Sequence, residues 1–211
     1  MINPATGKNS RTGDFNLPDN NAFFGFAKPY FNFVGKGKIY NVIYIVMAII
    51  NLLIPFAAIY AVIDSGFLQY SGAKFIVAFI FSWLIIAFAS WIGFQLWWHR
   101  KSIVRKVESA EFIATPVISD LIQTSGEWLG TFIGITGAGI GLITTIFLGN
   151  SADQAFRQFG LGFINYAPLL IITGPVTGFF IILISRFLAE QIKIFTSIAN
   201  NTREIAKNSR K

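Results

Sequence analysis

Few side chains in this sequence could carry out acid–base, nucleophilic or metal chemistry. The chain has no cysteine and one histidine, His99, which excludes a metal centre of the N/S type within one chain. His99 stands next to Arg100 and Lys101 with no visible nucleophile to activate. Glu127 beside Trp128 could belong to a site, but a carboxylate at the membrane interface is the simpler interpretation. We therefore assign no catalytic residue, no metal site and no cofactor, and we expect a non-enzymatic protein.

The elements that hold these residues are predicted from hydropathy. With 54% hydrophobic and 13% charged residues, the chain is too apolar for an ordinary soluble domain. Four runs match the roughly 20 apolar residues that cross a bilayer, namely residues 39–63, 75–98, 128–148 and 161–185. These runs contain no Asp, Glu, Lys, Arg or His, and such residues mark proton relays and ion paths in membranes. The predicted fold is an all-α, polytopic bundle of four transmembrane helices with amphipathic interfacial segments.

Three polar segments flank the membrane domain of residues 39–185. Residues 1–38 look like a lead-in with an aromatic interfacial stretch, and residues 99–127 like an amphipathic loop. Thr115-Pro116 is a helix-start signal, so the third helix should begin well before its span. Residues 186–211 continue the helical periodicity of the fourth span as a basic amphipathic tail.

The Lys and Arg residues predict the orientation. Fifteen of the 17 lie before the first span, between spans two and three, or after span four. The positive-inside rule then places both termini and the middle loop in the cytoplasm, in a bacterial inner membrane. We expect anionic lipid headgroups, and no nucleic acid, as partners of this charge. The headgroup flank consists of Lys36, Lys38, Arg100, Lys101, Arg105, Lys106 and Arg186. Tyr40, Trp97, Trp98 and Trp128 should mark the inner interface.

Glycines of the third span share one helix face. At 100° per residue, five of them fall within an arc of roughly 80°. In lipid, close backbone approach at small residues holds helices together, so this face predicts a docking seam. Gly174 and Gly178 of helix four are a candidate partner face, in the same chain or in a second copy, and Gly139 should face away. The predicted seam on helix three is Gly126, Gly130, Gly134, Gly137 and Gly141, extended by Thr144.

One short stretch resembles a known family. "LGTFIGI", residues 129–135, is similar to the Leu-Gly-Thr-x-x-Gly stretch in membrane helices of the proton-driven motor stator and TonB-energising families. The resemblance implies a pentameric, ion-driven assembly with Thr131 facing the ion path. It covers seven residues, and the large cytoplasmic insertion typical of those families is missing here.

The sequence favours a structural or accessory subunit that associates with itself or with a larger membrane complex. A pore-forming or ion-conducting subunit is the first alternative, and a membrane-embedded enzyme is the second.

The predicted orientation can be tested by cysteine accessibility, because the chain has no native cysteine. Single substitutions Ser102→Cys and Ser209→Cys should resist a membrane-impermeant thiol reagent in intact cells, since the positive-inside rule puts them in the cytoplasm. Ser71→Cys and Ser151→Cys are the matched external positions and should react. Labelling of Ser102→Cys from outside would reverse the orientation.

Overall fold

The structure is a computed structural model that describes residues 38–66, 72–107, 114–152, 156–157 and 166–209. These residues form four long helices and one short 3-10 turn, and they contain no strand. All four helices are long and apolar enough to cross a membrane, which confirms the all-α, four-helix membrane fold. The elements are α3 (Lys38–Asp64), α5 (Ala73–Val107), α6 (Ala114–Phe147), η1 (Gly149–Ser151) and α8 (Ala167–Asn208).

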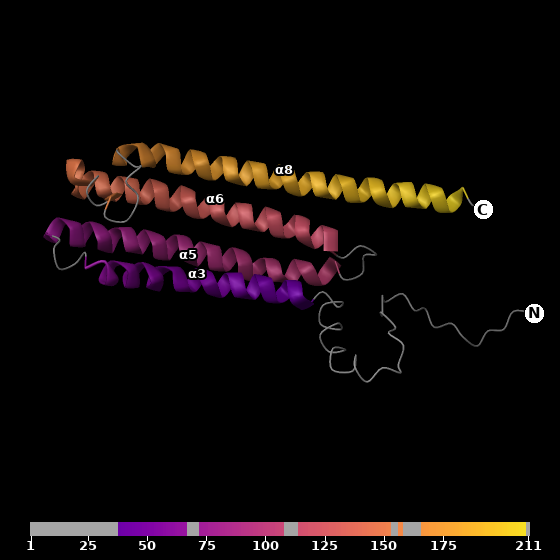
Figure 1. Cartoon of the computed structure of the whole chain (residues 1–211), viewed down its shortest axis with the longest axis horizontal. Helices are drawn as coiled ribbons and strands as arrows, with labels where there is room; N and C mark the ends of the chain where they lie inside the picture. The colour runs from indigo at the N-terminus through magenta and orange to yellow at the C-terminus, as the bar shows by residue number, and fades with distance from the viewer. Residues whose placement is uncertain (1–37, 67–71, 108–113, 153–155, 158–165, 210–211) are drawn as a thin grey trace, which may run out of the picture.

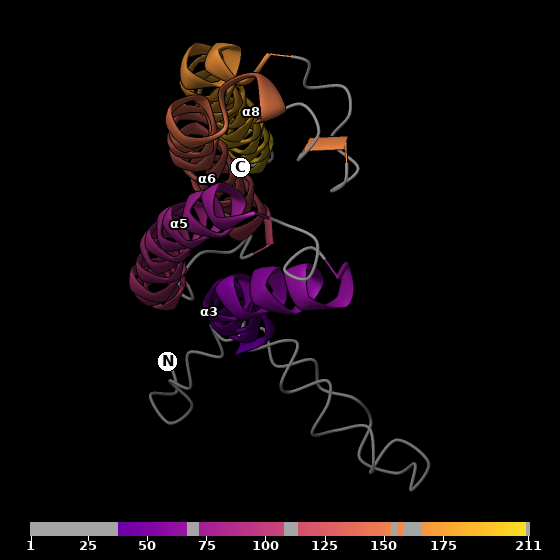
Figure 2. The ribbon, with the colours of Figure 1, turned by 90° about the vertical axis from the view of Figure 1, so that its left-hand side faces the viewer.

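The helices lie side by side in chain order, each antiparallel to the next (Figure 1). Contacts join α3 to α5, α5 to α6 and, most extensively, α6 to α8. Seen from the end, α6 and α8 lie closest together, with α5 and then α3 below them (Figure 2). The start of α3, the end of α5 and the start of α6 therefore share one end of the bundle (Figure 1). We call it the basic end because Arg100 and Arg186 form ion pairs there with Glu127 of α6.

The helices at the basic end run well beyond the predicted spans, as the sequence predicts for the third and fourth helices. Helix α5 continues to Val107 and α6 already begins at Ala114, so much of the expected loop 99–127 belongs to two long helices. No glycine or proline interrupts residues 99–107, which lets α5 run on. Helix α8 passes without a break from its span into the tail. Residues 1–37, including the expected aromatic segment, lie outside the described part of the chain.

A compact aromatic core fills the space between α3, α5 and α6 near the basic end. Tyr44 and Trp97 are fully buried and meet edge to face, with ring centroids 5.4 Å apart. Trp128 lies next to Trp97 and donates a hydrogen bond from Nε1 to Oδ1 of Asn51 at 2.5 Å. The expectation that Trp97 marks the lipid interface is therefore wrong, because neighbouring helices enclose its ring completely.

The five glycines of the arc on α6 lie opposite α8 of the same chain. A Cβ atom added at Gly130 would meet the Gly178 carbonyl and the Ile182 side chain, and one added at Gly126 would meet Ser185. At Gly137 it would lie 2.8 Å from Cα of Gly174. Such contacts leave no room for side chains, so the two backbones approach more closely here than larger residues would allow.

The remaining members of the arc are less uniform. A Cβ atom at Gly134 would lie 3.7 Å from Cα of Pro175, an ordinary contact, whereas one at Gly141 would lie 2.8 Å from Cβ of Leu170. Thr144 is buried and its hydroxyl donates to the Ile140 carbonyl at 2.7 Å. Gly139 faces away from α8, as predicted, but it points at Ile85 of α5, 2.7 Å from an added Cβ, and not at lipid.

Alanine substitutions at two positions of the arc separate packing from helix propensity. Alanine favours a helix interior over glycine by about 1 kcal/mol at either site. Gly134→Ala should therefore keep or raise the thermal midpoint in detergent, because its methyl group has room. Gly137→Ala should lower it, since forcing extra volume into close packing costs about 1–3 kcal/mol. Equal midpoints for the two variants would show that close approach of α6 and α8 does not hold them together.

Candidate functional site

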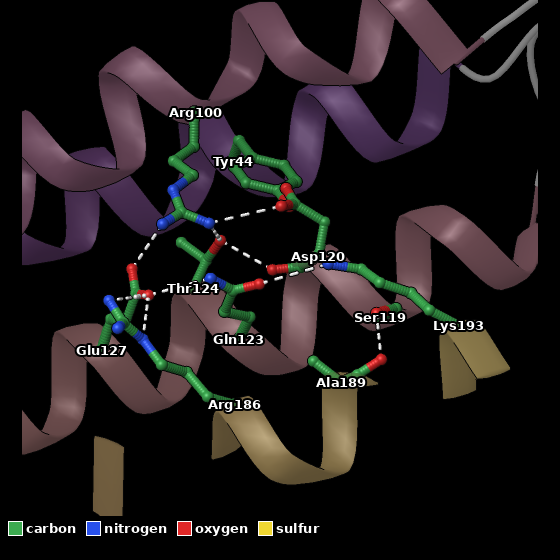
Figure 3. A network of polar contacts seen from close by, with 10 residues as sticks. All are labelled: Tyr44, Arg100, Ser119, Asp120, Gln123, Thr124, Glu127, Arg186, Ala189 and Lys193. Carbon is green, nitrogen blue, oxygen red and sulfur yellow. Dashed lines mark hydrogen bonds and ion pairs between the residues drawn. The ribbon is translucent and has the colours of Figure 1, made fainter. Parts of the chain in front are cut away.

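Among the described residues, the largest group of polar contacts lies on one face of α6 at the basic end (Figure 3). Asp120, Thr124 and Glu127 follow one another at spacings of four and three residues, which puts them on the same helix face. Arg100 reaches this face from α5, and Arg186 reaches it from α8. We call these five residues, together with Tyr44 of α3 and Gln123 of α6, the charged cluster.

Glu127 is the centre of the charged cluster. Its Oε2 accepts a hydrogen bond from Nη2 of Arg100, and its Oε1 accepts from Nε of Arg186 at 2.9 Å. Gln123, one turn earlier on α6, also donates to Oε1 at 3.0 Å. Glu127 is only 7% exposed, so its charge depends on these donors rather than on water. One carboxylate thereby connects α5, α6 and α8.

Asp120 joins α3, the remaining long helix, to the same cluster. Its Oδ2 accepts a hydrogen bond from the Tyr44 hydroxyl of α3 at 2.8 Å, and its Oδ1 accepts from Nη1 of Arg100 at 3.3 Å. The same Nη1 lies 3.4 Å from the Thr124 hydroxyl, which donates to the Asp120 carbonyl at 2.7 Å. Arg100 therefore binds both carboxylates, and every long helix contributes a side chain.

The charges of the cluster balance. Two guanidinium groups face two carboxylates, and the side chain of Arg100 is 22% exposed whereas that of Arg186 is 58% exposed. Ion pairs shielded from water are strong only when each charge is well hydrogen-bonded, as Glu127 is. Both carboxylates are thus paired with cations of the same chain, which is the arrangement of a structural ion-pair network.

Two further contacts tie α6 to the part of α8 that follows Arg186. The Ser119 hydroxyl donates to the Ala189 carbonyl at 2.7 Å, with both residues fully buried. Lys193 Nζ lies 3.5 Å from Oε1 of Gln123. The α6–α8 contact thus continues from the glycine arc past the charged cluster.

The structure divides the residues predicted to bind lipid headgroups. Arg100 and Arg186 turn their guanidinium groups inward to Glu127, so their main partners are carboxylates of the same chain. Lys38 lies at the start of α3, and Lys36 is outside the described residues. The other members of the predicted flank lie on α5, and their side chains are outside the described part of the structure. They are Lys101, Arg105 and Lys106.

The other candidate residues are not brought together. His99 Nδ1 lies 2.9 Å from the Gln95 carbonyl, one turn earlier on α5. Asp64 is at the opposite end of the bundle, at the end of α3, and Glu190 is exposed on α8. Thr131 is partly buried in α6. Among the described residues, no group of three His, Cys, Asp or Glu side chains could hold a metal ion.

Comparison with known proteins identifies no relative from which a function could be inferred. No protein-family model matches the chain, and no curated protein or solved structure matches it significantly. The residues and their geometry therefore carry the functional argument.

Removing the charge of Glu127 should destabilise the bundle far more than removing that of Arg186. Glu127→Gln leaves Arg100 and Arg186 without their shared anion, and hydrogen bonds to charged groups contribute about 1.5–3 kcal/mol. Arg186→Gln removes a half-exposed partner while Arg100 stays in place, which costs at most about 1 kcal/mol. Thermal midpoints of both variants in the same detergent check this order, and the reverse order would contradict the geometry.

Proposed function

We propose that this chain is a non-enzymatic membrane subunit with a structural or accessory role in a homo-oligomer or a larger membrane complex. The observation that carries the proposal is the use of the charged cluster within the fold. Its carboxylates bind Arg100, Arg186 and Tyr44 of the same chain, so they stabilise the bundle instead of facing a substrate or an ion path.

The open arrangement of the helices supports the same role. In the most apolar 18-residue stretch of each helix, only 22% of the residues of α3 and 17% of those of each other helix are buried within the chain. In a row of helices with so much outward apolar surface, most of that surface contacts lipid or neighbouring subunits. This favours a protein that works through its contacts over one that encloses a reaction.

The orientation belongs to the proposal as well. We place the basic end on the cytoplasmic side of a bacterial inner membrane, because it carries the Lys and Arg excess that the positive-inside rule assigns to that side. Anionic headgroups there would face the lysines and arginines that are not paired within the bundle.

The proposal is tested by the mass of the complex extracted directly from membranes. The tagged full chain, expressed at its natural level, is captured in lipid nanodiscs without detergent exchange. The expected particle contains more protein than one 23.4 kDa chain, as further copies or as companion subunits. A uniform particle with a single copy and no companion would contradict a subunit role, as would turnover of a substrate by the purified chain.

A further inference from the structure

The second half of α8 extends well beyond the other helices. The helix has 42 residues, which at 1.5 Å per residue gives a length of about 63 Å. The hydrocarbon core of a bilayer is only about 30 Å thick. Helix α8 runs on past the starts of α3 and α6 and the end of α5 (Figure 1), and every residue from 197 to 209 is exposed. We call residues 187–208 the α8 extension.

The α8 extension has an apolar stripe with a heptad repeat. The a positions are Leu188, Phe195 and Thr202, and the d positions are Gln191, Ile198 and Ile205. Phe195, Ile198 and Ile205 are 67%, 55% and 67% exposed, although residues of this type are normally covered. Regular a and d spacing is the pattern by which helices wind around one another.

The charged residues of the extension all avoid this stripe. They occupy only b, c and f positions and are Glu190, Lys193, Arg203, Glu204 and Lys207. The e and g positions, which flank the stripe, hold uncharged residues such as Ile192, Ile194 and Ala199. Two identical helices could therefore meet along the stripe without bringing like charges together.

The stripe lies on the side of α8 away from α6, and no described residue outside α8 is seen to cover its exposed side chains. Ala189 and Lys193, which contact Ser119 and Gln123 of α6 (Figure 3), occupy b and f positions opposite the stripe. The α6–α8 contact and a contact along the stripe are therefore compatible.

With the span ending at Ser185, as the sequence predicts, most of the stripe lies beyond the reach of lipid. From Ser185 to Ile205 a continuous helix rises about 30 Å, while each headgroup layer adds only about 5–8 Å to the hydrocarbon core. An amphipathic helix that binds a membrane surface lies in the plane of the interface. Helix α8 instead continues the direction of its span without a break through Asn208, which carries Phe195 and Ile198 away from the bilayer.

We propose that the α8 extension forms a parallel coiled coil with the same segment of a second copy of this chain. The inference rests on the proposed function in that it names the partner of the subunit. The strong Lys and Arg asymmetry orients every copy of this chain alike, so two α8 helices are parallel and at equal height, and equal residues meet. Polar residues at a and d positions, here Gln191 and Thr202, fix the register of such pairs at some cost in stability.

Cysteine cross-linking in membranes tests the register directly, because the full chain has no native cysteine. Ile198→Cys and Ile205→Cys, at d positions, should form a disulfide-linked dimer on mild oxidation, since d side chains of a parallel pair approach within disulfide distance. Ser197→Cys and Asn200→Cys, at c and f positions, are matched controls and should give several-fold less dimer. All four sites are exposed, so the variants should fold like the native chain.

Two results would overturn the inference. The first is equal dimer formation at Asn200→Cys and Ile198→Cys. The second is an uncross-linked Ile198→Cys that a water-soluble thiol reagent cannot reach, which would place the stripe on lipid or on a different protein. The mass of the particle in nanodiscs distinguishes a failure of the coiled-coil inference from a failure of the proposed function. A single copy with companion chains would refute the coiled coil alone, and a single copy without companions would refute both.

Discussion

The pairing of the buried Glu127 with Arg100, with the half-exposed Arg186 as a further partner, is the interaction on which the bundle depends. A carboxylate shielded from water is costly unless cations and hydrogen-bond donors surround it, and here the donors come from α5, α6 and α8. These contacts form only when the three helices stand at one relative height. Asp120 extends the constraint to α3 through the Tyr44 hydroxyl. Electrostatics at one end therefore fixes the vertical register of all four helices.

Along the rest of α6, packing replaces electrostatics. The hydrophobic effect does not drive helices together inside a bilayer, so close contact must do so. Gly130 and Gly137 bring the α6 backbone against Gly178 and Gly174 of α8, directly below the level at which Arg186 binds Glu127. The charged cluster sets the register, and the glycines allow the approach that this register needs. Together they explain why α6 and α8 make the most extensive contact in the chain.

The fold follows from the sequence to a large extent because membrane spans depend on length and hydropathy alone. The glycine arc was also visible, since residues at helical spacing share a face whatever their neighbours are. The charged cluster was not predicted. From the sequence, Arg100 and Arg186 flank spans and are expected to bind lipid headgroups, while Glu127 is interpreted as a carboxylate at the membrane interface.

The sequence contains a signal for the charged cluster, but interpreting it requires knowing which helices lie next to each other. Asp120, Thr124 and Glu127 repeat on one face of α6, yet only the long helical continuations of α5 and α6 beyond their spans bring Arg100 opposite that face. Trp97 is misplaced for a similar reason, since periodicity shows that a residue shares a face but not which helix covers that face.

The most direct test of this account is a double-mutant cycle between Arg100 and Glu127. Unfolding free energies would be measured in one detergent for the native chain, Arg100→Gln, Glu127→Gln and the double variant. If the two side chains stabilise the bundle through each other, the double variant loses about 1–3 kcal/mol less than the sum of the two single losses. Losses that add within about 0.5 kcal/mol would show that the pair does not hold the helices together.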